Sequence, residues 1–171
     1  MNREELVEQY EIYHQNRDTR DCEIKWHHID MIYALNKKLK LNSVLDYGCG
    51  HGKQWTERKI HKKMKIPEYA LYDIAYPDWT EMPEGNFDLV ISTDVLEHIP
   101  EGELLDEALK NIFSKANKAV FLKVGTTPAV KVLANGQNAH CTLKSKEEWR
   151  SILESLAEEY KVYMWLGFNN E

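Results

Sequence analysis

The sequence has few of the residues that mark several common protein classes. Its three cysteines, Cys22, Cys49 and Cys141, are an odd set without CxxC spacing, which fits reduced thiols better than a disulfide framework. No apolar run approaches the roughly 20 residues of a membrane span. The start of the chain, Met1 to Glu5, is acidic and lacks a signal-peptide core. We therefore expect a cytoplasmic protein with free thiols and no membrane association.

The composition indicates one globular domain. The chain has 171 residues, of which 43% are hydrophobic and 29% charged, enough for a single sizeable core without a separate substrate domain. We expect one domain over residues 1–171, with an N-terminal helical cap at 1–40 and a core at 41–171. A formal net charge of −6 argues against a broad nucleic-acid-binding face. The basic run at 58–65 is an exception, which we interpret as the solvated far end of a helix that starts near residue 52; a nucleic-acid contact is the alternative.

The most informative segment is VLDYGCGHG at residues 44–52. An apolar run ends in Asp46, and Gly48, Gly50 and Gly52 then alternate with larger residues. This pattern is typical of a strand that turns sharply into a nucleotide-binding loop, since residues without a Cβ let a ligand approach the backbone. A glycine-rich turn between two core elements is the other interpretation of this segment.

A second feature agrees with nucleotide binding. Asp73 ends another apolar run, 69–72, and follows Gly52 by 21 residues. This is close to the spacing of roughly 20 residues at which an acid reaches ribose hydroxyls in a βαβ unit.

The third block is FDLVISTDVLEHI at residues 87–99, a buried-strand run that breaks into a polar turn. The order of the three blocks resembles the class I S-adenosylmethionine (SAM) dependent methyltransferases over about residues 40–165. The resemblance implies methyl transfer from SAM, with S-adenosylhomocysteine as product. It also implies the cofactor-binding residues Asp46, Gly48, Cys49, Gly50, Gly52, Asp73, Ile74, Asp78, Trp79 and Asp94. A dehydrogenase would more typically show GxGxxG and would not need the third block.

The expected fold is α/β: a Rossmann-like, doubly wound, mostly parallel sheet flanked by helices. Apolar periodicity predicts helices at 3–15, 22–40 and 103–115, and Ser145 with Glu148 forms a capping box that opens another. Strands are expected at 43–47, 69–72, 119–124 and 162–166, besides the one that begins at residue 87. Only 14 residues separate Asp73 from Asp88, and prolines interrupt them, so we expect the family's usual third strand and its helix to be missing. The antiparallel hairpin that usually ends the family's sheet is also expected to be absent.

Several aromatic residues are candidates to cover the cofactor. In related methyltransferases N-terminal helices fold over the cofactor, which makes Tyr10, Tyr13, His14 and Trp26 candidates for a lid; helix-spaced aromatics are otherwise core residues. The segment around Asp78 and Trp79 resembles the family's loop over the adenine, or is a proline-bounded turn.

The residues expected to contact the methyl acceptor are Asp94, Glu97, His98 and His140. We predict His98 or His140 as a neutral general base, because imidazole titrates near physiological pH. If the turn after the strand is helical, Asp94, Glu97 and His98 project to one side and could hold a divalent metal with His140, an arrangement that we do not favour. It resembles ubiquinone-biosynthesis O-methyltransferases and the small-RNA 3′-terminal 2′-O-methyltransferases, except that Asp94 replaces a glutamate.

The sequence lacks an NPPY-like block for amino groups of nucleobases and a Pro-Cys nucleophile for cytosine C5 chemistry. We therefore predict a small-molecule acceptor with an oxygen nucleophile. The alternatives are metal-assisted 2′-O-methylation of an RNA 3′ terminus and a non-catalytic SAM-binding module. The sequence makes no prediction of oligomeric state.

Overall fold

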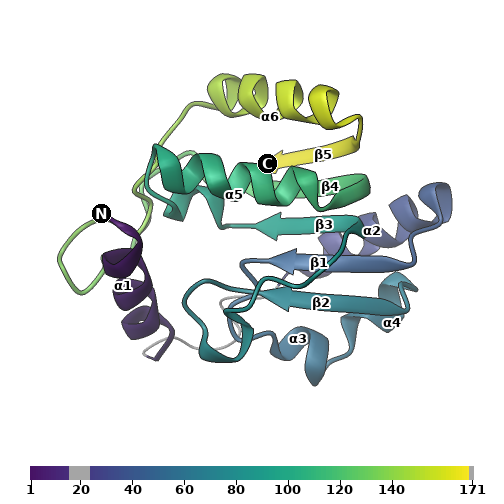
Figure 1. The fold of residues 1–171 in the computed structure, drawn as a ribbon, viewed down its shortest axis with the longest axis horizontal. Helices are drawn as coiled ribbons and strands as arrows, with labels where there is room; N and C mark the ends of the chain where they lie inside the picture. Colours follow the sequence, from purple (N-terminus) through teal and green to yellow (C-terminus); the bar gives the residue numbers. More distant parts are fainter. Residues whose placement is uncertain (16–23, 170–171) are drawn as a thin grey trace.

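A five-stranded parallel sheet forms the centre of the part of the chain that the computed structural model describes, residues 1–15 and 24–169 (Figure 1). The strand order is β2-β1-β3-β4-β5, and every neighbouring pair is parallel. The strands are β1 (Ser43–Tyr47), β2 (Glu68–Tyr72), β3 (Phe87–Thr93), β4 (Ala116–Val124) and β5 (Tyr163–Phe168). β1 pairs with both β2 and β3, so the strand order reverses there, and ligands bind outside the carboxyl ends of the strands at such a point. The predicted Rossmann-like α/β fold is confirmed.

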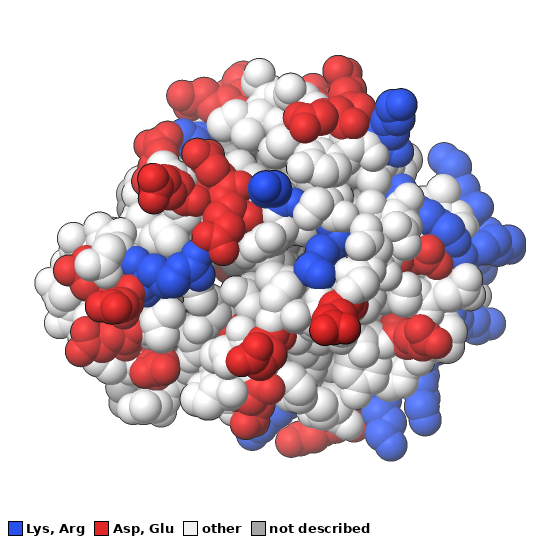
Figure 2. Space-filling model, in the orientation of Figure 1, with Lys and Arg blue, Asp and Glu red and all other residues white. Residues whose placement is uncertain are grey.

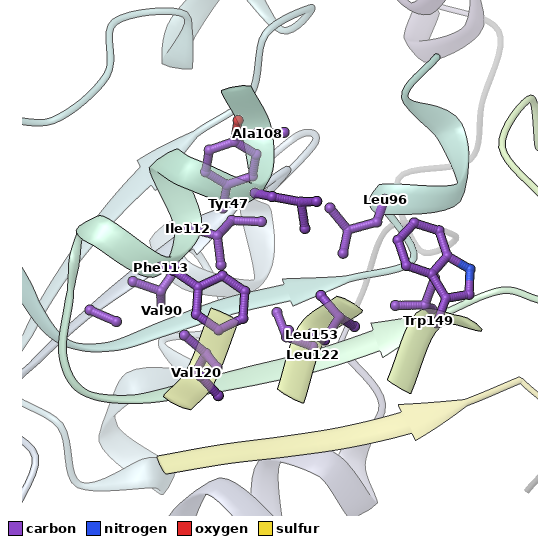
Figure 3. Packing of buried hydrophobic residues seen from close by; sticks show 14 of the residues in the cluster. Tyr47, Val90, Leu96, Ala108, Ile112, Phe113, Val120, Leu122, Trp149 and Leu153 are labelled. Atoms are coloured by element: carbon purple, nitrogen blue, oxygen red, sulfur yellow. The ribbon is translucent and has the colours of Figure 1, made fainter. Parts of the chain in front are cut away.

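The two faces of the sheet are buried in two separate apolar clusters. Leu45 and Val90 belong to the cluster between the sheet and the helices α5 (Glu103–Ser114) and α6 (Lys146–Tyr160). Figure 3 shows Val90 among the side chains of this cluster. Their chain neighbours Val44 and Leu89 belong to the cluster on the opposite face. Because both faces are covered, the strands are near-continuous apolar runs, and the sequence revealed them for that reason. The helices on the second face are α2 (Trp26–Leu39), α3 (Lys53–Thr56) and α4 (Ile60–Met64).

The predicted capping box of α6 is confirmed. The Ser145 hydroxyl accepts a hydrogen bond from the Glu148 amide at 3.1 Å, and the Glu148 carboxylate accepts one from the Ser145 amide at 2.8 Å. These two bonds satisfy amide groups that the first turn of a helix otherwise leaves without partners. The start of α6 is thereby fixed at the end of the long loop that follows β4.

The trimmed sheet is also confirmed. A single-turn 3₁₀ helix, η2 (Pro77–Trp79), stands between β2 and β3 in place of the family's extra helix and strand. β2 is therefore an edge strand. At the other end, β5 pairs in parallel with β4, and the described residues contain no antiparallel strand that extends the sheet.

The predicted long helix after the glycine loop is wrong. α3 ends at Thr56, and Lys59 adopts the left-handed conformation with φ +52° before α4 begins. A left-handed residue cannot continue a right-handed helix. The basic run at 58–65 therefore surrounds a separate short helix instead of ending a long one.

The helix α1 (Arg3–Gln15) lies across the carboxyl ends of the strands, whereas α2 lies against the sheet (Figure 1). Leu6 and Tyr10 of α1 pack with Ala75, Leu133 and Ala139 in a third, smaller apolar cluster. Of the described residues of the predicted helical cap, α1 thus covers the edge of the sheet and α2 packs on one of its faces. Cys22 lies outside the described residues. No helix within the described ranges is long and apolar enough to cross a membrane.

Candidate functional site

A cavity opens beneath α1 at the carboxyl ends of β1, β2 and β3. Six of the residues that the sequence predicted for the site line it: Gly48, Gly50, Asp73, Ile74, Asp94 and His98. The other six predicted residues are not among its lining residues: Asp46, Cys49, Gly52, Asp78, Trp79 and His140. The two groups have different surroundings.

The glycines of the loop are fixed by steric contact. Gly48 has φ +85°, and a Cβ atom there would lie 2.3 Å from a methyl carbon of Val95. Gly52 has φ +63°, and a Cβ atom there would lie 2.8 Å from Leu71 and 2.9 Å from the Trp79 indole. Only glycine combines these backbone angles with such close neighbours. The loop can thus present its backbone to a ligand at Gly48, while Gly52 provides a packing contact.

Asp73 organises the glycine loop. Its carboxylate accepts hydrogen bonds from the Gly50 amide at 2.8 Å and from the Ala75 amide at 3.0 Å. The side chain of His14, from α1, lies 3.7 Å away. Two backbone amides therefore hold this buried carboxylate beside the loop. Its predicted contact with a ribose stays a prediction.

Asp46 lies beneath the loop. Its carboxylate accepts a hydrogen bond from the Trp55 indole at 2.6 Å, which anchors α3 to the end of β1. Burial raises the pKa of Asp46 to about 7, and the nearby charge of Asp73 acts in the same direction. Cys49 is buried as well, and burial raises the pKa of its thiol. Neither side chain faces the cavity in this structure.

The proline-bounded segment packs against the glycine loop. The Trp79 carbonyl accepts a hydrogen bond from the Asp73 amide at 3.0 Å, and its indole lies against Gly52. Asp78 is exposed. The predicted contact of these two residues with an adenine ring stays a prediction.

α1 covers the cavity from above. Tyr10, Tyr13 and His14 line it, as do Arg3 and Leu6, for which no site role was predicted. The fourth lid candidate, Trp26, lies elsewhere: its ring is half exposed and sits beneath the ammonium group of Lys63. Tyr10 follows Leu6 by four residues, a spacing that puts both on one face of a helix, and this was the available signal for the arrangement.

The two predicted histidines lie together at the margin of the cavity. The rings of His98 and His140 are 4.7 Å apart, nearly perpendicular. His98 Nδ1 lies 2.8 Å from the Tyr10 hydroxyl and 2.9 Å from the Ala139 carbonyl. His140 Nδ1 lies 2.6 Å from the Thr127 carbonyl, and since a carbonyl only accepts, Nδ1 carries the proton in that bond. The neutral His140 ring therefore presents an unprotonated Nε2.

Glu97 is buried beside the histidines. One carboxylate oxygen accepts a hydrogen bond from the Gly125 amide at 2.7 Å, and the other has no hydrogen-bond partner among the described residues. Burial raises the pKa of Glu97 to about 8, with a further contribution from Asp94. One ligand atom from each of Glu97, His98 and His140 lies within 4.8 Å of the others. We call these three residues the acceptor cluster.

Asp94 does not join the acceptor cluster. It has φ +56°, and both of its carboxylate oxygens accept hydrogen bonds from the Lys123 ammonium, at 2.6 and 2.7 Å. The predicted common face of Asp94, Glu97 and His98 required a helix from residue 94. The helical turn, η3 (Leu96–His98), begins two residues later, so that prediction is wrong for Asp94.

Gly125 lies beside the acceptor cluster and was not predicted from the sequence. A Cβ atom there would lie 2.6 Å from the Glu97 carboxylate and 2.9 Å from the His140 ring. Its position immediately after a predicted strand was the only signal. The loop that carries His140 can approach Glu97 because residue 125 has no side chain.

The glycine loop, the buried acid at the end of β2 and the histidine pair at the end of β3 agree with one comparison. A family model described as a methyltransferase domain matches residues 26–156. The chain belongs to this methyltransferase family. No curated protein and no solved structure matches the chain. The methyltransferase uses SAM as methyl donor, as its family does. Gly48 and Gly50 of the glycine loop line the cavity beneath α1.

Proposed function

We propose that this methyltransferase transfers the methyl group of SAM to an oxygen nucleophile of a small molecule. The observation that carries the proposal is the acceptor cluster: two contacting imidazoles and a buried carboxyl group lie at the margin of the cofactor cavity. Bound SAM supplies an electrophilic methyl carbon on a sulfonium, and the protein has to orient the acceptor and remove one proton.

The roles of the residues follow from their contacts. The Gly48 and Gly50 backbone and the Asp73 carboxylate hold the cofactor's nucleoside. The Tyr10 hydroxyl and the Ala139 carbonyl orient the His98 ring. His140 Nε2 accepts the proton of the acceptor hydroxyl, while Nδ1 keeps its proton on the Thr127 carbonyl. The acceptor oxygen forms its bond to the methyl carbon as the carbon–sulfur bond breaks, and the bonding electrons remain on sulfur.

The acceptor cluster also supports a second candidate, metal-assisted O-methylation, including that of an RNA 3′-terminal 2′-hydroxyl. The Glu97 oxygen without a partner and two imidazole nitrogens are donors that Mn²⁺ accepts readily. The residues therefore fit a divalent ion with three protein ligands. Such an ion would lower the pKa of an acceptor hydroxyl. Asp94, held by Lys123, is not placed to be a fourth ligand.

One experiment tests the first proposal. His140→Ala should abolish methyl transfer from radiolabelled SAM in a screen of catechols and other hydroxyl compounds, and leave the Kd for SAM nearly unchanged in calorimetry. The matched control is His61→Ala, since His61 lies on α4, outside the lining of the cavity. Full transfer by the His140 variant would refute the role of His140 as base.

A titration with MnCl₂ separates the two candidates. If the acceptor cluster holds a metal, Mn²⁺ should bind the wild type and stimulate transfer, and Glu97→Gln should lose both effects. Because a metal must displace the Glu97 proton, its affinity should rise as the pH increases toward 8. Transfer that is unaffected by both Mn²⁺ and EDTA would leave only the metal-free mechanism.

A further inference from the structure

The basic residues of this acidic protein are concentrated in one part of the chain. Residues 25–65 contain ten Lys and Arg against three Asp and Glu, whereas the other residues contain twelve against twenty-five. In Figure 2 the blue side chains gather along the right-hand margin, where Figure 1 places α2 and α4, and red side chains dominate the upper and left parts. One end of the molecule is therefore positive although the net charge is −6.

The fold brings two basic segments together that are separate in the sequence. The side-chain amide of Asn36, near the end of α2, donates hydrogen bonds to the carbonyls of Met64 and Lys65 at 2.9 and 2.8 Å. The end of α2 is thereby joined to the end of α4. Seven exposed lysines lie on these helices or at their ends, and we call them the basic face: Lys37, Lys38, Lys40, Lys59, Lys62, Lys63 and Lys65. None of them forms an ion pair with a carboxylate of the described residues.

Two aromatic rings of α2 lie in contact with these lysines. The Lys63 ammonium lies 4.1 Å from the centre of the Trp26 ring, and Trp26 is 53% exposed. Lys37 and Lys65 lie over the Tyr33 ring at 4.4 and 5.5 Å. Cations from both helices thus share the aromatic residues of α2.

Helix ends alone do not explain so much positive charge. The end of a helix carries about half a negative charge, so two adjacent ends attract about one cation. The basic face has seven. Lys40, Lys59 and Lys65 also adopt positive φ values of 52° to 55°, a conformation that favours glycine. Binding of an anion would relieve the repulsion among these cations.

We propose that the basic face binds the phosphate backbone of single-stranded nucleic acid. Such a strand presents regularly spaced phosphates together with flat bases, and lysines around the exposed Trp26 ring and the half-buried Tyr33 ring match both. An acidic peptide would use the lysines but not the rings. A membrane surface would require more apolar side chains than Trp26 and Met31, the two large exposed ones on α2.

The basic face lies away from the cofactor cavity, since none of its seven lysines lines that cavity. Lys25, immediately before α2, lines the cavity, and α2 then runs for 14 residues, or about 21 Å, toward the amino ends of the strands. Binding on the basic face is therefore a property separate from the cofactor site. It can be measured without SAM and without a methyl acceptor.

The test measures the fluorescence anisotropy of a labelled oligouridylate at several salt concentrations. Lys63→Gln/Lys65→Gln should weaken binding about tenfold and reduce the slope of log affinity against log salt by about 0.7 for each lost phosphate contact. The matched control is Lys110→Gln/Lys161→Gln, which likewise changes one exposed helical lysine and one left-handed lysine that caps a helix. The control should bind like the wild type. Trp26→Ala should weaken binding severalfold, and Trp26→Phe should largely restore it.

Three results would overturn the proposal. The first is the absence of binding by the folded wild type at low salt, and the second is equal weakening by the two double variants. The third is binding of polyglutamate or of phosphatidylserine vesicles as tightly as RNA, which would indicate an acidic protein segment or a membrane instead. Melting curves and the Kd for SAM, expected to match the wild type in each variant, show that any lost binding is not caused by unfolding.

Discussion

The Glu97 carboxylate accepts a hydrogen bond from the Gly125 amide at 2.7 Å, and this bond joins the turn after β3 to the end of β4. It holds a buried acid whose second oxygen has no hydrogen-bond partner among the described residues. Two predictions concern this pair of residues.

Glu97→Gln should change the pH dependence of stability. Burial raises the pKa of Glu97 from 4.5 to about 8 in the folded chain. The folded chain therefore binds this proton more tightly, so the stabilisation is complete below pH 4.5 and is lost as the pH rises to about 8. Glutamine cannot ionise and keeps an acceptor for Gly125. Between pH 5 and 8 the free energy of unfolding, from urea titrations, should fall more for the wild type than for Glu97→Gln; parallel curves would contradict the buried acid.

Gly125→Ala should move Glu97 and His140 of the acceptor cluster apart without weakening SAM binding. Its Cβ atom would meet the Glu97 carboxylate at 2.6 Å and the His140 ring at 2.9 Å, so these two groups must move apart. We expect a large loss of kcat with a Kd for SAM within about twofold of the wild type. Gly167→Ala is the control, since its Cβ atom is equally crowded, by Trp165, but lies on β5. Equal loss of kcat in both variants would point to general destabilisation.

Gly48→Ala should weaken SAM binding and lower stability together. The new Cβ atom would lie 2.3 Å from Val95 at a φ of +85°. Gly136→Ala is the control that measures the cost of the left-handed backbone conformation alone, because Gly136 has φ +83° and open space around its Cβ position. Left-handed strain alone costs about 1 kcal/mol. Thermal unfolding should therefore show a distinctly larger loss of stability for Gly48→Ala than for Gly136→Ala. Gly48→Ala/Val95→Ala should recover part of the difference, and no recovery would mean that Val95 is not the obstacle.

Asp73→Ala should weaken SAM binding by about 1.5 to 3 kcal/mol, the usual worth of hydrogen bonds to a charged group. It should also lower the melting temperature, since the Gly50 and Ala75 amides lose their acceptor. Asp73→Asn keeps one acceptor oxygen, so its SAM affinity and its melting temperature should lie between those of the wild type and of Asp73→Ala. Calorimetry and thermal melting measure both effects. An unchanged Kd would show that the ribose is held by another residue.

The sequence predicted the parts of the site that local pattern determines. Gly48 and Asp73 stand at the ends of buried strands, and the carboxyl ends of adjacent parallel strands necessarily meet. The shortened connection between β2 and β3 followed from a residue count and two prolines. The capping box at Ser145 needs no tertiary contact at all.

The sequence could not predict what depends on contacts between distant residues. Lys123 binds the carboxylate of Asp94, 29 residues earlier in the chain, and so keeps it out of the acceptor cluster. Asn36 joins two basic helix ends through its bond to Met64, 28 residues later. The interruption of the predicted helix at Lys59 was also not predicted, because lysine favours helices and rarely adopts a left-handed conformation. Tertiary packing overrides local preference at such positions.

The all-parallel sheet has a consequence for how the chain folds. Each strand pair must be closed by a long connection: Val44 pairs with Leu89, 45 residues later, and Ala119 with Tyr163, 44 residues later. A chain dominated by such non-local pairing loses loop entropy before its contacts form, so folding should take milliseconds to seconds. Until β4 docks, β3 exposes an apolar edge to other chains. Refolding yield should therefore fall as protein concentration rises, although the native protein is acidic and its strands are covered on both faces.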